Sequence, residues 1–214
     1  MHVPDGFMSA PVNLAGAVVS TAAVGTALAR AKDTLEEKQV PLLAVTAAFI
    51  FAAQMLNFPV AAGTSGHFLG AVLAAVLLGP WNGMIALSLV VILQCLLFGD
   101  GGLTALGTNV FNMAVLGCLA GWGILRVLRR LLPQNRAGLM AAVAGAAWAS
   151  IVLAASACAA ELALSGTAPL GAALPAMAGV HAIIGVGEAL ITMAVLAAVY
   201  SSRPDLPAER EVSR

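Results

Sequence analysis

The stretch PAMAGVHAIIGVGEALITMAVLAAVY, residues 175–200, decides the fold class. It is apolar over more than the roughly 20 residues that an α-helix needs to cross the hydrocarbon core of a bilayer. Apart from the closing tyrosine, its acid–base side chains are His181 and Glu188, which are two helical turns apart and share one helix face. This stretch therefore predicts a membrane-spanning helix.

The composition of the whole chain agrees with that stretch. Of its 214 residues, 61% are hydrophobic and only 9% are charged, and the mean hydropathy is +0.97. A soluble domain carries about 25% charged residues, so the lipid bilayer is the expected surroundings. No cluster of basic and aromatic residues indicates nucleic-acid binding. We expect a multi-pass protein of the cell membrane.

Apolar runs recur along the chain and predict an all-α bundle of seven transmembrane helices. The runs lie near residues 12–29, 40–58, 68–78, 81–98, 110–128, 137–164 and 175–200. The third run is short, and residues 59–66 before it are rich in residues that break helices. Irregular backbone at membrane depth is tolerated where it is buried in protein or lines a cavity, so we expect a buried site beside residues 59–66.

The Lys and Arg residues predict the orientation. With seven spans they all fall on one side, in three groups: Arg30, Lys32 and Lys38; Arg126, Arg129, Arg130 and Arg136; Arg203, Arg210 and Arg214. The positive-inside rule places that side in the cytoplasm. The prediction is one transmembrane domain, residues 1–202, with an external N-terminus and a polar cytoplasmic tail, residues 203–214. The first span lacks the basic flank of a cleaved signal peptide, so we expect no cleavage there.

Cysteine chemistry is not expected. Cys95, Cys118 and Cys158 each sit inside an apolar run and share no CxxC spacing. They are predicted to be small buried hydrophobic residues, and neither a disulfide framework nor a zinc site follows from them.

The first two residues could bind a metal. Methionine aminopeptidase removes Met only before small residues, so Met1 is expected to stay ahead of His2. The α-amine, the deprotonated His2 amide nitrogen and the His2 Nδ1 can then close a five-membered and a six-membered chelate ring. Such nitrogen-rich planar coordination suits Ni(II) and Cu(II), and Co(II) less strongly.

His67 is the candidate for the fourth corner of this plane. It follows the irregular stretch and lies on the same predicted side as Met1. The alternative is that His2 is an ordinary solvated terminal residue and that His67 caps a helix. The residues by themselves leave both interpretations open.

Several blocks of the sequence resemble the CbiM/NikM family, the substrate-specific membrane components of energy-coupling-factor cobalt and nickel transporters. The similar blocks are MHVPDGFMS (1–9), NFPV (57–60), GTSGHFLG (63–70), LGPW (78–81), QCLLFGDGGLTALGTN (94–109) and HAIIGVGEALIT (181–192). They occur in order along the whole chain. The blocks around Gly-Thr-Ser-Gly-His and Phe-Gly-Asp-Gly-Gly-Leu-Thr are the most specific.

The resemblance implies a fold and a metal site. In the family an extra first span threads the N-terminus toward the bundle centre. The implied metal ligands are Met1, His2 and His67, with residues 1–11 as the metal-binding segment. The bound Co²⁺ or Ni²⁺ would be the transported substrate, and no catalytic cofactor is expected.

The resemblance also implies partners. They are a transmembrane coupling subunit, two cytoplasmic ATPase subunits and often a small additional membrane subunit. The chain itself has no P-loop, since the Gly-rich loop around Asp100 lacks the required Lys.

Other polar residues could support the metal from a second layer. Gln94, Asn109 and Asn112 are candidates for orienting the ligands. Ionisable groups inside a membrane are costly and indicate function by default, so His181 and Glu188 join them. The alternative for His181 and Glu188 is a buried hydrogen-bonded pair between helices.

Two other function classes remain to be distinguished. A stand-alone facilitator would pass metal without ATPases. An intramembrane metal-dependent enzyme is disfavoured, because no HExxH motif is present and a filled planar site leaves no position for water. The sequence does not decide between cobalt and nickel.

Overall fold

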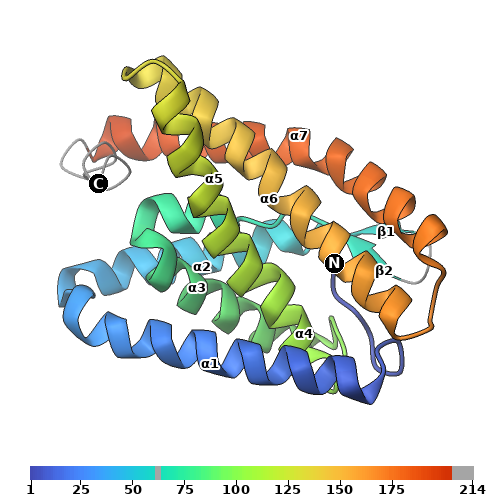
Figure 1. Ribbon diagram of the computed structural model, residues 1–214. Helices are drawn as coiled ribbons and strands as arrows, with labels where there is room; N and C mark the ends of the chain where they lie inside the picture. The colour runs from blue at the N-terminus through green and yellow to red at the C-terminus, as the bar shows by residue number, and fades with distance from the viewer. Residues whose placement is uncertain (61–63, 204–214) are drawn as a thin grey trace.

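The computed structural model describes residues 1–60 and 64–203 and is built mainly of helices (Figure 1). Beyond Arg203, the expected tail lies outside the described residues. In chain order the elements are α1 Ala10–Thr34, the 3₁₀ turn η1 Glu37–Gln39, α2 Val40–Gln54, β1 Phe58–Val60, β2 Thr64–Gly66, α3 Ala71–Phe98, α4 Leu106–Val110, the π-helical turn η2 Phe111–Leu116, α5 Gly117–Leu131, α6 Arg136–Leu164 and α7 Leu170–Ser202.

Helix α3 contains the third and fourth predicted apolar runs, and it is broken between them. Gly79 has φ 79° and ψ 159°, a conformation that glycine adopts without strain, and Pro80 follows as the start of the next arm. A Cβ atom on Gly83 would lie 2.9 Å from the carbonyl carbon of Ala74. The chain therefore folds back at Gly79, and the two arms of α3 pack against each other.

Among the described residues, five segments are long and apolar enough to cross a membrane: Ala10–Asp33, Ala71–Phe98, Leu106–Leu131, Arg136–Leu164 and Leu170–Ser202. The third of them joins α4, η2 and α5 into one helix. Helix α2 is apolar but has only 15 residues. The chain is thus a helical, multi-pass membrane protein, whereas the count of seven crossings and the orientation stay predictions.

The described part of the stretch at residues 58–66, namely residues 58–60 and 64–66, differs from the expectation. Instead of irregular backbone, β1 and β2 form a short antiparallel hairpin in which Phe58 pairs with Gly66 and Val60 with Thr64. The hairpin satisfies backbone polar groups that would otherwise be costly near an apolar core. It also leads directly into His67 and α3.

Small residues on α1 face two different surroundings. Ala17 is half-buried against α4, where a Cβ atom on Gly107 would collide with it. Ala17, Thr21, Gly25 and Ala29 form a stripe of small residues at a spacing of four, and the last three are exposed in this chain. Only the first residue of the stripe therefore packs against an internal neighbour.

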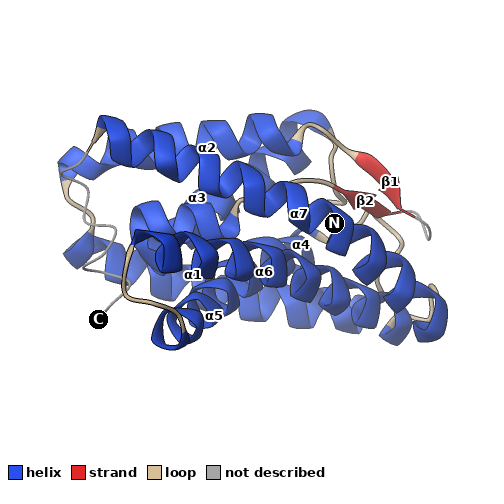
Figure 2. Cartoon of the chain, turned by 90° about the horizontal axis from the view of Figure 1, so that it is seen from above, coloured by secondary structure: helices blue, strands red, loops and turns tan. Residues whose placement is uncertain are grey.

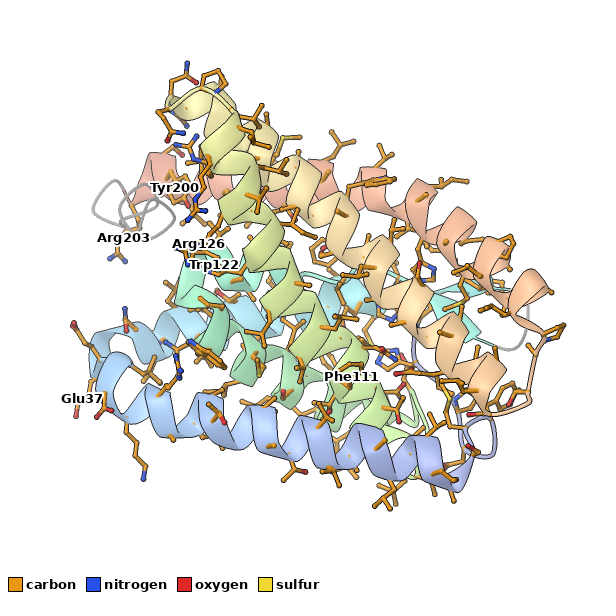
Figure 3. All side chains as sticks on the ribbon, in the orientation of Figure 1. Glu37, Phe111, Trp122, Arg126, Tyr200 and Arg203 are labelled. Atoms are coloured by element: carbon orange, nitrogen blue, oxygen red, sulfur yellow. The ribbon has the colours of Figure 1, made fainter. Side chains whose placement is uncertain are left out.

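The described segments that carry Lys and Arg lie at one end of the bundle. The α1–α2 connection, the α5–α6 connection and the end of α7 lie on the left of Figure 1, opposite the hairpin and the α6–α7 connection. Figure 3 places Arg126 and Arg203 at this left end, together with Glu37. This arrangement agrees with the sorting of Lys and Arg on one side of a membrane.

Thiol labelling tests the orientation. In a background with Ala at all three native cysteines, an impermeant thiol reagent applied to intact cells should label the Leu103→Cys variant and spare the Ala137→Cys variant. Both positions are exposed and lie at opposite ends of the bundle. Both variants should react once the cells are opened, and labelling of Ala137→Cys alone in intact cells would reverse the predicted orientation.

Candidate metal centre

The first residues of the chain run into the interior of the bundle, as Figures 1 and 2 both show. Met1, His2 and Val3 are 0%, 3% and 0% exposed. The Met1 amine donates to the carbonyl oxygen of Ser65 in β2, and it lies 3.3 Å from the Ser65 hydroxyl. This hydrogen bonding places the amine beside the hairpin that precedes His67.

Val3 is fixed on both sides of its backbone. Its amide donates to Asn109 Oδ1 at 2.9 Å, and its carbonyl oxygen accepts from Asn109 Nδ2 at 3.1 Å. The amide of Gly102 donates to the same carbonyl at 2.8 Å. A Cβ atom on Gly102 would lie 2.3 Å from the Asp5 nitrogen, so only glycine permits this close approach. The N-terminal segment is therefore held against residues 99–109.

The two predicted ligand histidines meet at this point. The rings of His2 and His67 stack with centroids 4.7 Å apart and an interplanar angle of 26°. His2 Nε2 is 3.0 Å from Gln94 Oε1, and His67 Nδ1 is 2.7 Å from the carbonyl oxygen of Phe68. The other ring nitrogens, His2 Nδ1 and His67 Nε2, are buried and have no hydrogen-bond partner.

Burial keeps the Met1 amine and the imidazoles of His2 and His67 neutral. Loss of solvent lowers the pKa of the Met1 amine to about 5, against smaller opposing effects of Cys158 and Asp100. Loss of solvent, with the nearby amine as second cause, lowers the pKa of His2 to about 4. The same two causes hold the pKa of His67 well below its ordinary value. At neutral pH the three groups offer lone pairs rather than protons.

The predicted supporting residues divide into two groups. Gln94 contacts His2, and Asn109 contacts Val3. Asn112, in η2, instead donates to Glu161 at 2.5 Å. The structure therefore brings Gln94 and Asn109 to the site and gives Asn112 a different partner.

The two ionisable residues of α7 have separate partners. Glu188 accepts from the amides of Leu69 and Gly70 at 2.6 and 2.7 Å, directly after the His67 segment. His181 Nδ1 is 2.7 Å from the carbonyl oxygen of Met177, and its buried Nε2 has no hydrogen-bond partner. Whether either residue affects metal binding stays a prediction.

Sequence reasoning missed three neighbours of the site. Asp100, considered only as part of a Gly-rich loop that lacks a P-loop Lys, places Oδ1 3.3 Å from His2 Nδ1. Gln54 hydrogen-bonds Gln94 from α2, and Ser65 accepts from the Met1 amine. The sequence signal that could have indicated Gln54 is its position as a polar amide residue within an otherwise apolar run.

The site is not a cluster of side-chain ligands. Within residues 1–60 and 64–203, no group of three or more His, Cys, Asp or Glu side chains could hold a metal ion. The amine, one main-chain amide nitrogen and two imidazoles nevertheless make four nitrogens available within one buried region. Half of these four nitrogens belong to the main chain.

Comparison with known proteins defines the class as metal transport rather than enzyme catalysis. A protein of Haloquadratum walsbyi whose name assigns it to metal transport is 40% identical over 208 residues, which cover 96% of this chain and 93% of that one. The fused nickel transport protein NikMN of Rhodobacter capsulatus is 37% identical, over 98% of this chain and 65% of its own length. A crystal structure of a truncated transition metal transporter superimposes with a TM-score of 0.87 at 34% identity, covering 94% of this chain and 99% of that one.

The family match then gives the particular assignment. Residues 2–206 match the family described as the cobalt uptake substrate-specific transmembrane region, CbiM. The chain belongs to this family. It is a membrane protein of the cobalt and nickel transport group, as its sequence resemblance had implied.

Proposed function

We propose that this chain is the substrate-binding subunit of an energy-coupling-factor transporter, and that it captures Ni²⁺ or Co²⁺ through its N-terminus. The proposed ligands are the Met1 amine, the His2 amide nitrogen, His2 Nδ1 and His67 Nε2. For this the first residue of the mature chain must be Met1. The family membership supports metal transport, and the four-nitrogen site is our inference from the geometry.

One observation carries the proposal. Buried polar atoms normally have hydrogen-bond partners, yet His2 Nδ1 and His67 Nε2 have none. His2 Nδ1 is also the ring nitrogen that a chelate through the preceding amide and amine requires. These two ring nitrogens, which have no hydrogen-bond partner although Asp100 Oδ1 lies 3.3 Å from His2 Nδ1, thus coincide with the two imidazole positions that the proposed coordination needs.

The remaining partners are part of the same proposal. We infer a transmembrane coupling subunit and two ATPase subunits, often with a small additional membrane subunit, because uphill uptake needs an energy source. No phosphate-binding loop occurs in the sequence. Accumulation of metal should therefore depend on proteins other than this chain.

Uptake measurements test the dependence on ATPases. Cells lacking all coupling and ATPase subunits should accumulate radioactive Ni²⁺ or Co²⁺ only at background level when this chain is expressed alone. Co-expression of the coupling and ATPase subunits should restore accumulation, and a variant of the ATPase that cannot hydrolyse ATP should not. Full high-affinity accumulation by the chain alone would favour the facilitator instead.

The lowered pKa values predict how many protons metal binding releases. Near pH 7 the amine, with a pKa of about 5, and both imidazoles are already neutral. Only the His2 amide then loses a proton, so we expect release of about one proton per metal and an affinity that falls about tenfold per pH unit. Below pH 5 the amine also binds a proton, and the fall becomes steeper.

Calorimetry in buffers of different ionisation enthalpy measures this proton count. An amine with the ordinary pKa of about 8 would be mostly protonated at pH 7 and would raise the count to about two. A count of two or more at pH 7 would therefore contradict the buried, neutral amine. A count near zero would contradict coordination by the deprotonated amide.

A further inference from the structure

Two buried glutamines form a chain of hydrogen bonds that ends on His2. Gln54 lies on α2 and Gln94 on α3, and both are 0% exposed. Gln54 Nε2 donates to the carbonyl oxygen of Leu69 at 2.8 Å, and Gln94 Nε2 donates to Gln54 Oε1 at 3.0 Å. Gln94 Oε1 is then left facing His2 Nε2 at 3.0 Å.

The direction of this chain follows from its first member. The carbonyl oxygen of Leu69 can only accept, so the Gln54 atom that faces it must be the amide nitrogen. Gln54 then presents its amide oxygen to Gln94, so the Gln94 amide nitrogen must donate to it. Gln94 in turn presents its oxygen to His2. Reversing either amide would set two donors or two acceptors against each other in a buried place, which is costly.

The last bond has a consequence for the imidazole. A neutral imidazole carries its proton on one nitrogen and a lone pair on the other. Because Gln94 Oε1 can only accept, His2 must place its proton on Nε2. The lone pair is then on Nδ1, the atom without a hydrogen-bond partner. We propose that Gln54 is a positioning residue for the metal site, which acts through Gln94 to hold His2 in the Nε2-protonated tautomer.

The Leu69 peptide that starts the chain is itself fixed. Its amide donates to Glu188 Oε2 at 2.6 Å, while its carbonyl oxygen accepts from Gln54. It lies two residues after His67, whose own proton is placed on Nδ1 by the carbonyl oxygen of Phe68. The same short segment therefore orients both histidines, one directly and the other through the two glutamines.

The carboxylate of Asp100 lies beside His2 Nδ1. Its Oδ1 lies 3.3 Å away, but the two atoms do not have hydrogen-bond geometry. Asp100 Oδ2 instead accepts from Asn57 Nδ2 at 3.1 Å. A competing proton on Nδ1 would leave Gln94 Oε1 facing a lone pair, so the glutamine chain opposes that tautomer.

Nitrogen NMR of the metal-free protein tests the tautomer directly. The chain has three histidines, so ¹⁵N-histidine labelling gives three pairs of ring signals, and the His2→Ala variant identifies the pair of His2. Protonated and unprotonated ring nitrogens resonate in well-separated regions. We expect a protonated Nε2 and an unprotonated Nδ1 for His2. A protonated Nδ1 in the native protein would overturn the proposal.

Substitution of Gln54 tests whether this residue holds the tautomer of His2. Gln54→Met keeps a long side chain but removes both amide groups, so the Gln94 amide is free to turn over. We expect a Nδ1-protonated population to appear at His2, and affinity for Ni²⁺ to fall about 10- to 100-fold, as for other groups that orient metal ligands. Gln54→Leu carries the same prediction if Gln54→Met folds poorly.

Gln134→Met is the matched control. Gln134 makes a comparable set of hydrogen bonds, to Arg129 and the Leu132 carbonyl oxygen, in the connection between α5 and α6. The Gln134→Met variant should leave the His2 NMR signals and the affinity for Ni²⁺ unchanged. A native His2 spectrum and native affinity in folded Gln54→Met would overturn the role of Gln54.

This inference rests on the proposed function, but the two can fail separately. If native protein does not bind Ni²⁺, the proposed function fails, whatever the spectrum shows. If native protein binds Ni²⁺ and Gln54→Met binds it equally well, only the present inference fails.

Discussion

Replacing His67 with alanine is expected to eliminate high-affinity binding of both Ni²⁺ and Co²⁺. The substitution removes the one imidazole that can close the fourth corner of the chelate made by Met1 and His2. Groups that merely orient metal ligands cost 10- to 100-fold in affinity, so loss of a ligand should cost at least about 100-fold. Calorimetry on purified protein measures the effect.

A chemical rescue separates loss of the ligand from loss of the fold. His67 is fully buried, and its removal leaves a space next to the proposed metal position. Added free imidazole should occupy that space and restore part of the affinity of His67→Ala. Cys118→Ala, another buried position, should bind normally. Native affinity in His67→Ala without imidazole would remove His67 from the ligand set.

Two extra glycines before Met1 are expected to have an equally large effect. The extension converts the Met1 amine into an amide nitrogen and places the new amine two residues further from His2. A single glycine would not serve, because a Gly-Met-His terminus could itself offer Ni²⁺ a planar set of four nitrogens. The extension also has no room, because Met1 is 0% exposed and its nitrogen contacts the carbonyl oxygen of Ser65. We expect a loss of at least about 100-fold in affinity, as for removal of any direct ligand.

The control for this experiment is at the other end of the chain. The same two glycines added after Arg214 should leave the affinity unchanged. An acetylated or formylated Met1 should behave like the glycine extension, since both modifications remove the basic amine. Equal affinity of the extended and native proteins would exclude the amine as a ligand.

The helices were predictable because their signal is local. Long apolar runs predict membrane helices, and the ends of the predicted runs near 137–164 and 175–200 lie within 5 residues of the ends of α6 and α7. The break after residue 78 was visible as Gly79 followed by Pro80. The sequence did not show that the two arms fold back and pack on each other, because this packing depends on the close approach of Gly83 to Ala74.

The hairpin at residues 58–66 was missed for a related reason. Pro59 and the glycines indicated a break in helical structure, which the structure confirms, but pairing of Phe58 with Gly66 depends on a register that no periodic pattern in three-residue strands reveals. A run this short carries no alternation with which to predict a strand.

The candidate site was predictable only where chemistry is tied to sequence. The Met1–His2 chelate follows from neighbouring residues, and the family resemblance supplied His67. Gln54 and Asp100 come from distant parts of the chain and enter the site through packing of α2 and of the loop after α3. Asn112, expected near the ligands, turns instead to Glu161.

X-ray absorption at the nickel edge tests most directly whether the metal lies in a planar site of four nitrogens at the N-terminus. The sample is Ni²⁺-loaded protein whose first residue is Met1. We expect a square-planar spectrum with nitrogen ligands only and no bound water. A six-coordinate spectrum with oxygen or sulfur ligands would contradict this planar site.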